Sequence, residues 1–159
     1  MDKKIIDIGY KSEWPASALS NFAAHRFVID GVVCESMEGF LQSLKFEDPE
    51  VQEKVCKLVG VKAKYRGKRK KWWLTQTLWW RGKKYDRHGK RYQKLLDRAY
   101  LALSKNKDFR KALLATGDAT LIHSIGKTDP YRTILTEQEF CSRLEKIREL
   151  ISKRRKKEL

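Results

Sequence analysis

Residues 34–46 read CESMEGFLQSLKF, and this stretch predicts the helix around which we expect the rest of the chain to be arranged. Ser36 is a favourable N-cap, because its side-chain oxygen can accept a hydrogen bond from a backbone N–H of the first turn. Glu38 follows in that turn, where the helix dipole favours an anion. Asp48-Pro49 ends the segment, so the pattern predicts a short helix.

One side of this predicted helix carries an acid, an amide and an amine. Glu38, Gln42 and Lys45 stand at i, i+4 and i+7, within about 60° of one another on an α-helix. The apolar arc beside them consists of Met37, Phe40, Leu41 and Leu44. Such an arrangement is typical of a pocket wall. The alternative is an ordinary amphipathic helix whose Glu38 and Lys45 point into solvent.

Length and composition fit one folded domain. The chain has 159 residues, of which 41% are apolar, and its five Trp, six Tyr and six Phe are enough to bury a core. We expect a domain over residues 1–152 and a basic, disordered tail over residues 153–159. The chain has no long apolar run, and residues 1–7 lack a signal-peptide pattern, which predicts a soluble, cytoplasmic protein without a membrane partner.

The formal net charge of +16 is concentrated in one segment. Residues 57–94 hold 15 basic side chains and 1 acidic side chain. This density favours a nucleic-acid or other phosphate-rich partner, and the alternative is a merely solvated basic face. Tryptophans are interleaved with these cations and could stack on bases, although we expect at least two of the indoles in the core. The cations expected to contact nucleic acid are Lys64, Arg66, Lys68, Arg69, Lys70, Lys71, Lys83, Lys84 and Arg87.

Turn signals and periodicity predict the remaining elements. Asp30-Gly31 lies between β-branched residues and predicts a hairpin over residues 27–34, because a type I′ turn needs two residues that tolerate positive φ. Thr136 and Glu139 match a capping box that opens the last helix. The other expected elements are strands at 5–8 and 121–125 and helices at 49–60, 92–103 and 107–114.

Several kinds of chemistry lack a sequence signature here. The histidines and cysteines show no metal-ligand spacing, and GxSxG, GxGxxG and P-loop motifs are missing, so we expect neither a metal nor a cofactor. The cysteines are odd in number and widely spaced, which predicts reduced, packed thiols. Short glycine loops at 116–118 and 126–129 could hold phosphates or ribose hydroxyls, or could be ordinary helix ends and turns.

A set of motifs then occurs in a defined order. It comprises Leu19-Ser20-Asn21-Phe22, the Asp30-Gly31 hairpin, residues 36–46 from Ser36 to Phe46, FRKALLATGD at 109–118, and Asp129. On these motifs the chain resembles the NADAR superfamily, also called YbiA-like, over roughly residues 19–149. The resemblance implies a mostly helical α+β fold: a single YbiA-like domain in which a small N-terminal β-hairpin or sheet packs on helices.

The resemblance also implies an activity and roles for individual residues. Members are metal-independent N-glycosidases; some cleave riboflavin-biosynthesis intermediates, and others remove ADP-ribose from modified guanine in nucleic acid. Lys45 matches the lysine that attacks the anomeric carbon, and Glu38 matches the acid/base glutamate. Pro130-Tyr131 stands where many members have a tryptophan. The expected substrate contacts are Asn21, Phe22, Gln42, Trp79, Trp80, Gly117, Asp118, Gly126, Lys127 and Asp129.

The residue chemistry is compatible with that activity. Departure of a base from C1 of ribose leaves an oxocarbenium-like centre, which a neutral amine can capture as a Schiff base while a carboxyl group moves the protons. Lys45 would need a lowered pKa, and the apolar arc beside it can supply one.

We therefore predict an N-glycosidase that removes ADP-ribose from guanine in DNA or RNA, because the basic segment suits a polymeric substrate. One alternative is an N-glycosidase acting on small phosphorylated riboflavin intermediates. Another is a non-catalytic module that binds nucleic acid or ADP-ribose.

Overall fold

The predicted central helix lies inside the protein. Six of the seven residues of α2 (Met37–Ser43) are buried. Its N-cap is Ser36, as predicted; the Ser36 Oγ accepts a hydrogen bond from Gly39 N at 3.0 Å and donates one to the carbonyl of Leu58 at 2.8 Å. The apolar arc of α2 therefore forms part of the core, and Phe40 packs edge-on against Trp80 with ring centroids 4.9 Å apart.

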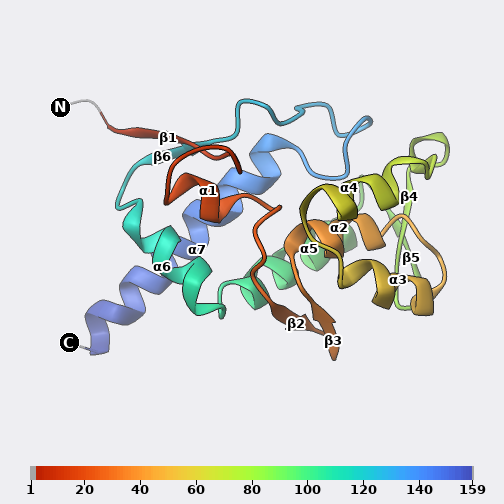
Figure 1. Cartoon of the computed structure of the whole chain (residues 1–159), viewed down its shortest axis with the longest axis horizontal. Helices are drawn as coiled ribbons and strands as arrows, with labels where there is room; N and C mark the ends of the chain where they lie inside the picture. Colours follow the sequence, from red (N-terminus) through yellow and green to blue (C-terminus); the bar gives the residue numbers. More distant parts are fainter. Residues whose placement is uncertain (1–2, 159) are drawn as a thin grey trace.

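The computed structural model describes residues 3–158, so Met1, Asp2 and Leu159 lie outside the described residues. Within this range the protein has the predicted α+β fold in which helices predominate (Figure 1). The other α-helices are α1 (Ala16–Leu19), α3 (Pro49–Cys56), α4 (Gly60–Lys68), α5 (Lys90–Leu103), α6 (Lys107–Ala115) and α7 (Glu137–Glu158). A 3-10 helix, η1, spans Trp72–Leu74.

The described strands form three two-stranded sheets. Their bounds are β1 (Ile5–Asp7), β2 (Phe27–Ile29), β3 (Val32–Cys34), β4 (Thr77–Trp80), β5 (Lys83–Asp86) and β6 (Thr120–Ile122). Strands β1 and β6 pair in parallel, with Ile5 opposite Thr120, whereas β2–β3 and β4–β5 are antiparallel hairpins. The β2–β3 turn is the predicted one, with φ of 50° at Asp30 and 78° at Gly31.

The elements divide the molecule along its long axis (Figure 1). Helices α1, α6 and the C-terminal part of α7 lie towards one end with the β1–β6 sheet. Helices α2, α3 and α4 lie towards the other end with the β4–β5 hairpin. Helix α5 runs between the two groups and contacts β2, β5 and α7. The described part of the chain contains no helix that is both long enough and apolar enough to cross a membrane.

Arg87 corrects one sequence prediction. We expected it to contact nucleic acid, but its side chain is 1% exposed and forms an ion pair with Glu139. The guanidinium donates to the two Glu139 carboxylate oxygens at 3.1 and 2.6 Å, and Nε donates to the carbonyl of Thr133 at 2.9 Å. Arg87 therefore joins the end of β5 to the start of α7 and cannot reach a phosphate.

The length of α7 corrects a second sequence prediction. We expected residues 153–159 to be disordered, but α7 continues without a break to Glu158. Its start is the predicted capping box: Glu139 N donates to Thr136 Oγ1 at 3.1 Å, and Thr136 N donates to Glu139 Oε1 at 2.8 Å. Cys34, Cys56 and Cys141 are free and buried, as expected.

Gly39 offers a test of how tightly α2 is packed. A Cβ at this position would lie 2.6 Å from the Leu58 carbonyl oxygen and 2.9 Å from that of Cys56, both of which are backbone atoms. Gly39→Ala should lower the free energy of unfolding by about 2 kcal/mol, because this overlap outweighs the gain of about 1 kcal/mol in helix propensity. Urea unfolding followed by circular dichroism measures the change.

Gly9→Ala is the matched control for this substitution. A Cβ there would meet only the Ser12 Oγ at 3.2 Å, and that side chain can rotate away. The control should change stability by less than about 0.5 kcal/mol. Equal stabilities of the two variants would show that the contact between α2 and the end of α3 is loose.

Candidate active site

A cavity of about 1220 Å³ lies between α2, α4 and the segment from residue 123 to residue 136. Residues 20–22, in the loop after α1, form another wall of the cavity. Nine of the residues that the sequence analysis singled out line it, and these are Asn21, Phe22, Glu38, Gln42, Lys45, Lys64, Lys68, Gly126 and Lys127. Acid, amide and amine therefore face one cavity, and the solvent-facing alternative for Glu38 and Lys45 is wrong.

Glu38 is held at the first turn of α2. Its backbone N–H donates to the carbonyl of Asn21 at 2.9 Å, and its Oε1 accepts a hydrogen bond from Gln42 Nε2 at 2.8 Å. Burial raises the pKa of the Glu38 carboxyl above its usual range, and the Gln42 hydrogen bond opposes this only in part. A carboxyl with a raised pKa can act as a general acid closer to neutral pH.

Lys45 lies two residues beyond the end of α2, directly after its C-cap Leu44, and lines the same cavity. Burial lowers the pKa of its amine to about 8, against the opposing effect of the Glu38 carboxylate. About a tenth of the amine is therefore neutral at pH 7, which is the form that acts as a nucleophile. Within residues 3–158, Lys45 forms no ion pair with Glu38, so the two groups remain separate reactive positions.

Asn21 and Gln42 are fixed by their surroundings. The buried phenol of Tyr100 donates to Asn21 Oδ1 at 2.8 Å, which orients the amide in the cavity wall. Gln42 lies against Gly67 of α4, where any added Cβ would overlap the Gln42 amide. Gly67 therefore lets α4 approach α2 closely enough to complete the cavity.

His123 is a cavity residue whose role sequence reasoning missed. Its Nδ1 lies 2.7 Å from the carbonyl oxygen of Ile8, and its backbone N–H donates to Glu137 Oε2 at 2.7 Å. The ring packs edge-on against Phe140. Nδ1 therefore carries a proton, and Nε2 is left as the second polar atom of the ring. His123 directly follows β6, whereas the sequence pattern placed it inside the expected strand at 121–125, so no sequence signal marked it as a cavity residue.

Aromatic and basic side chains gather around the cavity. Tyr65 is 61% exposed, Trp73 46% and Tyr131 60%. The Tyr10 ring packs against that of Phe22, one of the expected contacts, with centroids 5.0 Å apart. The basic side chains that line the cavity are Lys45, Lys64, Lys68, Lys127 and Arg132.

Some expected contacts lie elsewhere. Trp80 is 2% exposed and donates from Nε1 to Asp30 Oδ2 at 2.8 Å. Neither Trp80 nor Trp79 lines the cavity, whereas Trp72 and Trp73 do. Two of these four indoles, Trp72 and Trp80, are buried, as expected. Trp73 is exposed at the cavity, and Trp79 is half-buried outside it.

Three further expected contacts, Gly117, Asp118 and Asp129, stand outside the lining. Gly117, with φ of 60°, follows Thr116, the C-cap of α6, and Asp118 comes next. Asp129 caps the backbone N–H of Tyr131 at 3.0 Å and pairs with Arg132 at 3.8 Å, so it shapes the loop beside the cavity.

The expected nucleic-acid contacts divide into groups. Lys64 and Lys68 line the cavity, whereas Arg66 and Lys70 lie over the ring of Phe46 at 4.5 and 5.2 Å from its centroid. Arg69, Lys71, Lys83 and Lys84 are exposed outside the cavity.

The fold that holds this cavity is YbiA-like. The NMR structure of the E. coli protein YbiA matches 98% of this chain and 89% of that chain with a TM-score of 0.66 at 18% sequence identity. This likeness confirms the YbiA-like fold that the sequence predicted.

The chain belongs to the family described as Bacteriophage protein GP30.3, whose model matches residues 13–149. It is 38% identical over 152 residues to an uncharacterized 17.1 kDa protein in the Gp30-rIII intergenic region of Enterobacteria phage T4. That match covers 91% of this chain and 97% of the phage T4 protein.

The burial of Lys45 predicts a gain in stability when the amine is removed. Lys45→Met should raise the free energy of unfolding by about 1–2 kcal/mol at pH 7, because the ammonium is charged in the folded state at a cost in hydration. The amine titrates at about 8 when folded and near its usual 10.5 when unfolded. The free energy of unfolding of the wild type therefore rises as the pH increases from about 8 to about 10.5. The difference in stability between the two proteins should disappear above about pH 10.

Urea unfolding of both proteins across this pH range measures the effect. Lys54→Met, at an exposed position of α3, is the control and should show little difference at any pH. A Lys45→Met protein that is less stable than the wild type at pH 7 would show that the amine remains well hydrated in the folded state.

Proposed function

We propose that this protein is an N-glycosidase that removes ADP-ribose from modified guanine bases in DNA or RNA. The observation that carries the proposal is the cavity shared by Glu38, with a raised carboxyl pKa, and Lys45, with a lowered amine pKa. When the pKa of one group is raised and that of its neighbour is lowered, so that both move towards neutral pH, the pair often acts as acid and nucleophile.

The proposed reaction uses both groups in turn. The protonated Glu38 donates to guanine while the bond between ribose C1 and the base nitrogen breaks, and the bonding electron pair leaves with the base. The neutral Lys45 amine adds to the oxocarbenium-like C1 and gives up a proton to the Glu38 carboxylate. Glu38 returns this proton to the ring oxygen as the bond between C1 and that oxygen breaks, and the nitrogen lone pair forms the C=N bond of a protonated Schiff base. Water then hydrolyses the Schiff base, which releases ADP-ribose and restores the amine.

The size and lining of the cavity suit an ADP-ribose group. Its volume of about 1220 Å³ has room for an ADP-ribose group. Lys64, Lys68 and Lys127 can pair with the diphosphate, and the exposed Trp73 can stack on a base. His123 Nε2 can bond to a ribose hydroxyl.

The test is incubation with an oligonucleotide that carries ADP-ribosylated guanine, followed by mass spectrometry of released ADP-ribose. Lys45→Ala should abolish turnover together with any adduct trapped by borohydride. Glu38→Gln should slow turnover by about 10²–10⁴-fold, the usual contribution of a positioned general acid. Lys54→Ala, which removes an exposed cation from α3, should keep the wild-type rate.

Other outcomes would redirect or end the proposal. Full activity of Lys45→Ala would rule the mechanism out. Release of sugar only from small phosphorylated riboflavin intermediates would favour the metabolic N-glycosidase. Binding of the oligonucleotide without release of any sugar by the wild type would favour a non-catalytic binding module.

A further inference from the structure

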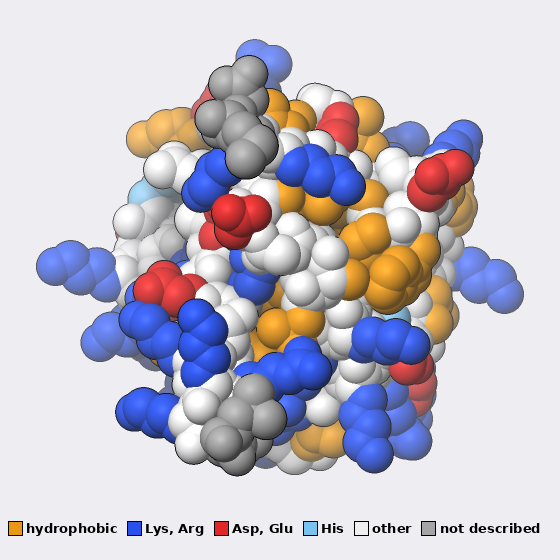
Figure 2. Space-filling view, turned by 90° about the vertical axis from the view of Figure 1, so that its left-hand side faces the viewer, with side chains coloured by type: hydrophobic (Ala, Val, Ile, Leu, Met, Phe, Trp, Pro, Cys, Tyr) orange, Lys and Arg blue, Asp and Glu red, His pale blue; other side chains and the backbone are white. Residues whose placement is uncertain are grey.

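A second groove, of about 490 Å³, lies on the end of the molecule that carries α1, α6 and the C-terminal part of α7. It shares no lining residue with the cavity of Glu38 and Lys45. Figure 2 shows this end of the protein, where Lys and Arg side chains surround apolar areas on the lower half of the face. The groove is therefore a separate surface from the candidate active site.

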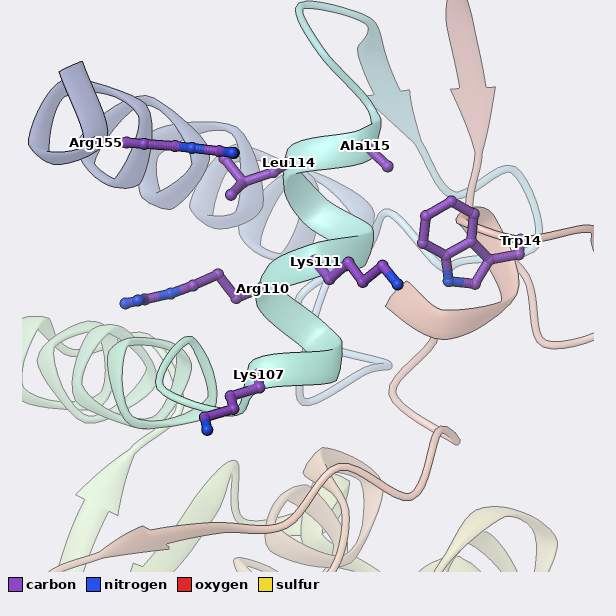
Figure 3. A pocket seen from close by; sticks show the side chains of 7 residues that line it. All are labelled: Trp14, Lys107, Arg110, Lys111, Leu114, Ala115 and Arg155. Atoms are coloured by element: carbon purple, nitrogen blue, oxygen red, sulfur yellow. The ribbon is translucent and has the colours of Figure 1, made fainter. Parts of the chain in front are cut away.

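The spacing of residues on α6 creates the floor and one wall of the groove. Lys107, Arg110, Lys111 and Leu114 stand at i, i+3, i+4 and i+7, so one face of the helix carries them all. Phe109, Ala112 and Leu113 are buried on the other side. Lys111 extends from α6 towards the indole of Trp14, while Arg110 and Arg155 lie on the side nearer α7 (Figure 3).

Helix α7 contributes because it continues where we expected a disordered tail. Residues 153–157 are five consecutive cations in the last turns of the helix, and Arg155 lines the groove. The buried Arg148 donates to Thr116 Oγ1 at 2.9 Å, which fixes α7 against the end of α6. The basic end of α7 is therefore held at a defined place beside α6.

The lining of the groove is basic. Four of its seven lining residues are cations, and none of the seven is acidic. Glu13, Asp108 and Asp118 are close to lining residues in the sequence but lie outside the lining, and Glu149 pairs with Lys153 at 2.9 Å. Cations spaced along two packed helices favour an extended anion with repeated charges over a single small one.

Trp14 narrows the class of that anion. Its side chain is 55% exposed, although the protein has ample core in which an indole could be buried. An exposed indole beside a row of cations matches the way proteins hold single-stranded nucleic acid, in which bases stack on aromatic rings while cations follow the phosphates. We propose that the α6–α7 groove binds single-stranded nucleic acid, with Lys107, Lys111 and Arg155 on the phosphates and Trp14 stacked on a base.

This inference concerns binding alone and goes beyond the proposed reaction. If the protein is a glycosidase, the groove gives it a second hold on a polymeric substrate, away from the bond that is cleaved. The binding test uses unmodified strands, so its failure and the failure of the proposed activity can be told apart.

The experiment measures binding of a fluorescent, unmodified strand of about 20 nucleotides, a length that exceeds a typical single-strand site. Fluorescence anisotropy is recorded over a range of salt concentrations. The double variant Lys111→Glu/Arg155→Glu should bind about 10–100-fold more weakly, and the slope of log K against log salt should fall by roughly 2. Trp14→Ala should weaken binding about tenfold with little change in slope, because stacking releases no counterions.

The matched control is Lys54→Glu/Lys57→Glu on and after α3, which makes the same change in net charge at exposed positions outside the groove. It should keep at least half of the wild-type affinity. Equal losses in the two double variants would overturn the proposal, because binding would then depend on net charge alone. So would unchanged oligonucleotide binding together with lost binding to anionic phosphatidylglycerol vesicles, since the groove would then recognise a membrane surface.

Hydrolysis adds a second readout if the glycosidase activity is found. The Lys111→Glu/Arg155→Glu variant should lower kcat/KM on the long modified strand and leave it unchanged on ADP-ribosylated guanosine. An equal loss on both substrates would show that the substitutions disturb the cavity instead, and would count against a separate binding site.

Discussion

The candidate active site depends on keeping a carboxyl and an amine in one partly dehydrated cavity without letting them form an ion pair. Burial moves the pKa of Glu38 up and that of Lys45 down to about 8, so each group spends more time in its uncharged form. A close ion pair would reverse both displacements. Their separation along α2 and just beyond it is therefore the geometric condition for any chemistry that needs an acid and a free amine.

The packing around α2 maintains that separation. Gln52 of α3 donates from Nε2 to the carbonyls of Ser43 and Trp79, at 3.1 and 2.8 Å, and the Trp79 N–H donates to the carbonyl of Leu44 at 2.8 Å. The backbone immediately before Lys45 is thus bonded on two sides. Two glycines also contribute to this packing: without side chains, Gly39 and Gly67 let α3 and α4 approach α2 closely. Desolvation of the reactive groups costs stability, and this dense packing offsets it.

Local rules account for what the sequence predicted well. The Ser36 cap, the Asp30-Gly31 turn and the Thr136–Glu139 capping box each depend on residues within a few positions, and each has the predicted geometry. The second hairpin was missed because its turn residues, Arg81 and Gly82, adopt positive φ without the usual Asn or Asp signal.

Non-local contacts explain the other errors. Arg87 is buried because Glu139, far along the chain, supplies its counter-charge. Trp80, which we expected to contact substrate, lies in the core, where the carboxylate of Asp30 accepts its indole N–H. The place of His123 was equally hidden, since the Ile8 carbonyl that fixes its ring belongs to a strand at the other end of the sequence.

The distribution of charge also depends on contacts that the sequence pattern does not reveal. The basic segment 57–94 looks uniform in the sequence, yet folding sends its cations to different surroundings: Lys64 to the cavity, Arg66 to the Phe46 ring and Arg87 to the core. The α6–α7 groove shows the converse, because it draws its cations from two segments far apart in the sequence that meet only in the fold. Net charge per segment thus indicates that a polyanion is a suitable partner, whereas the tertiary contacts of α6 and α7 determine where it can be held.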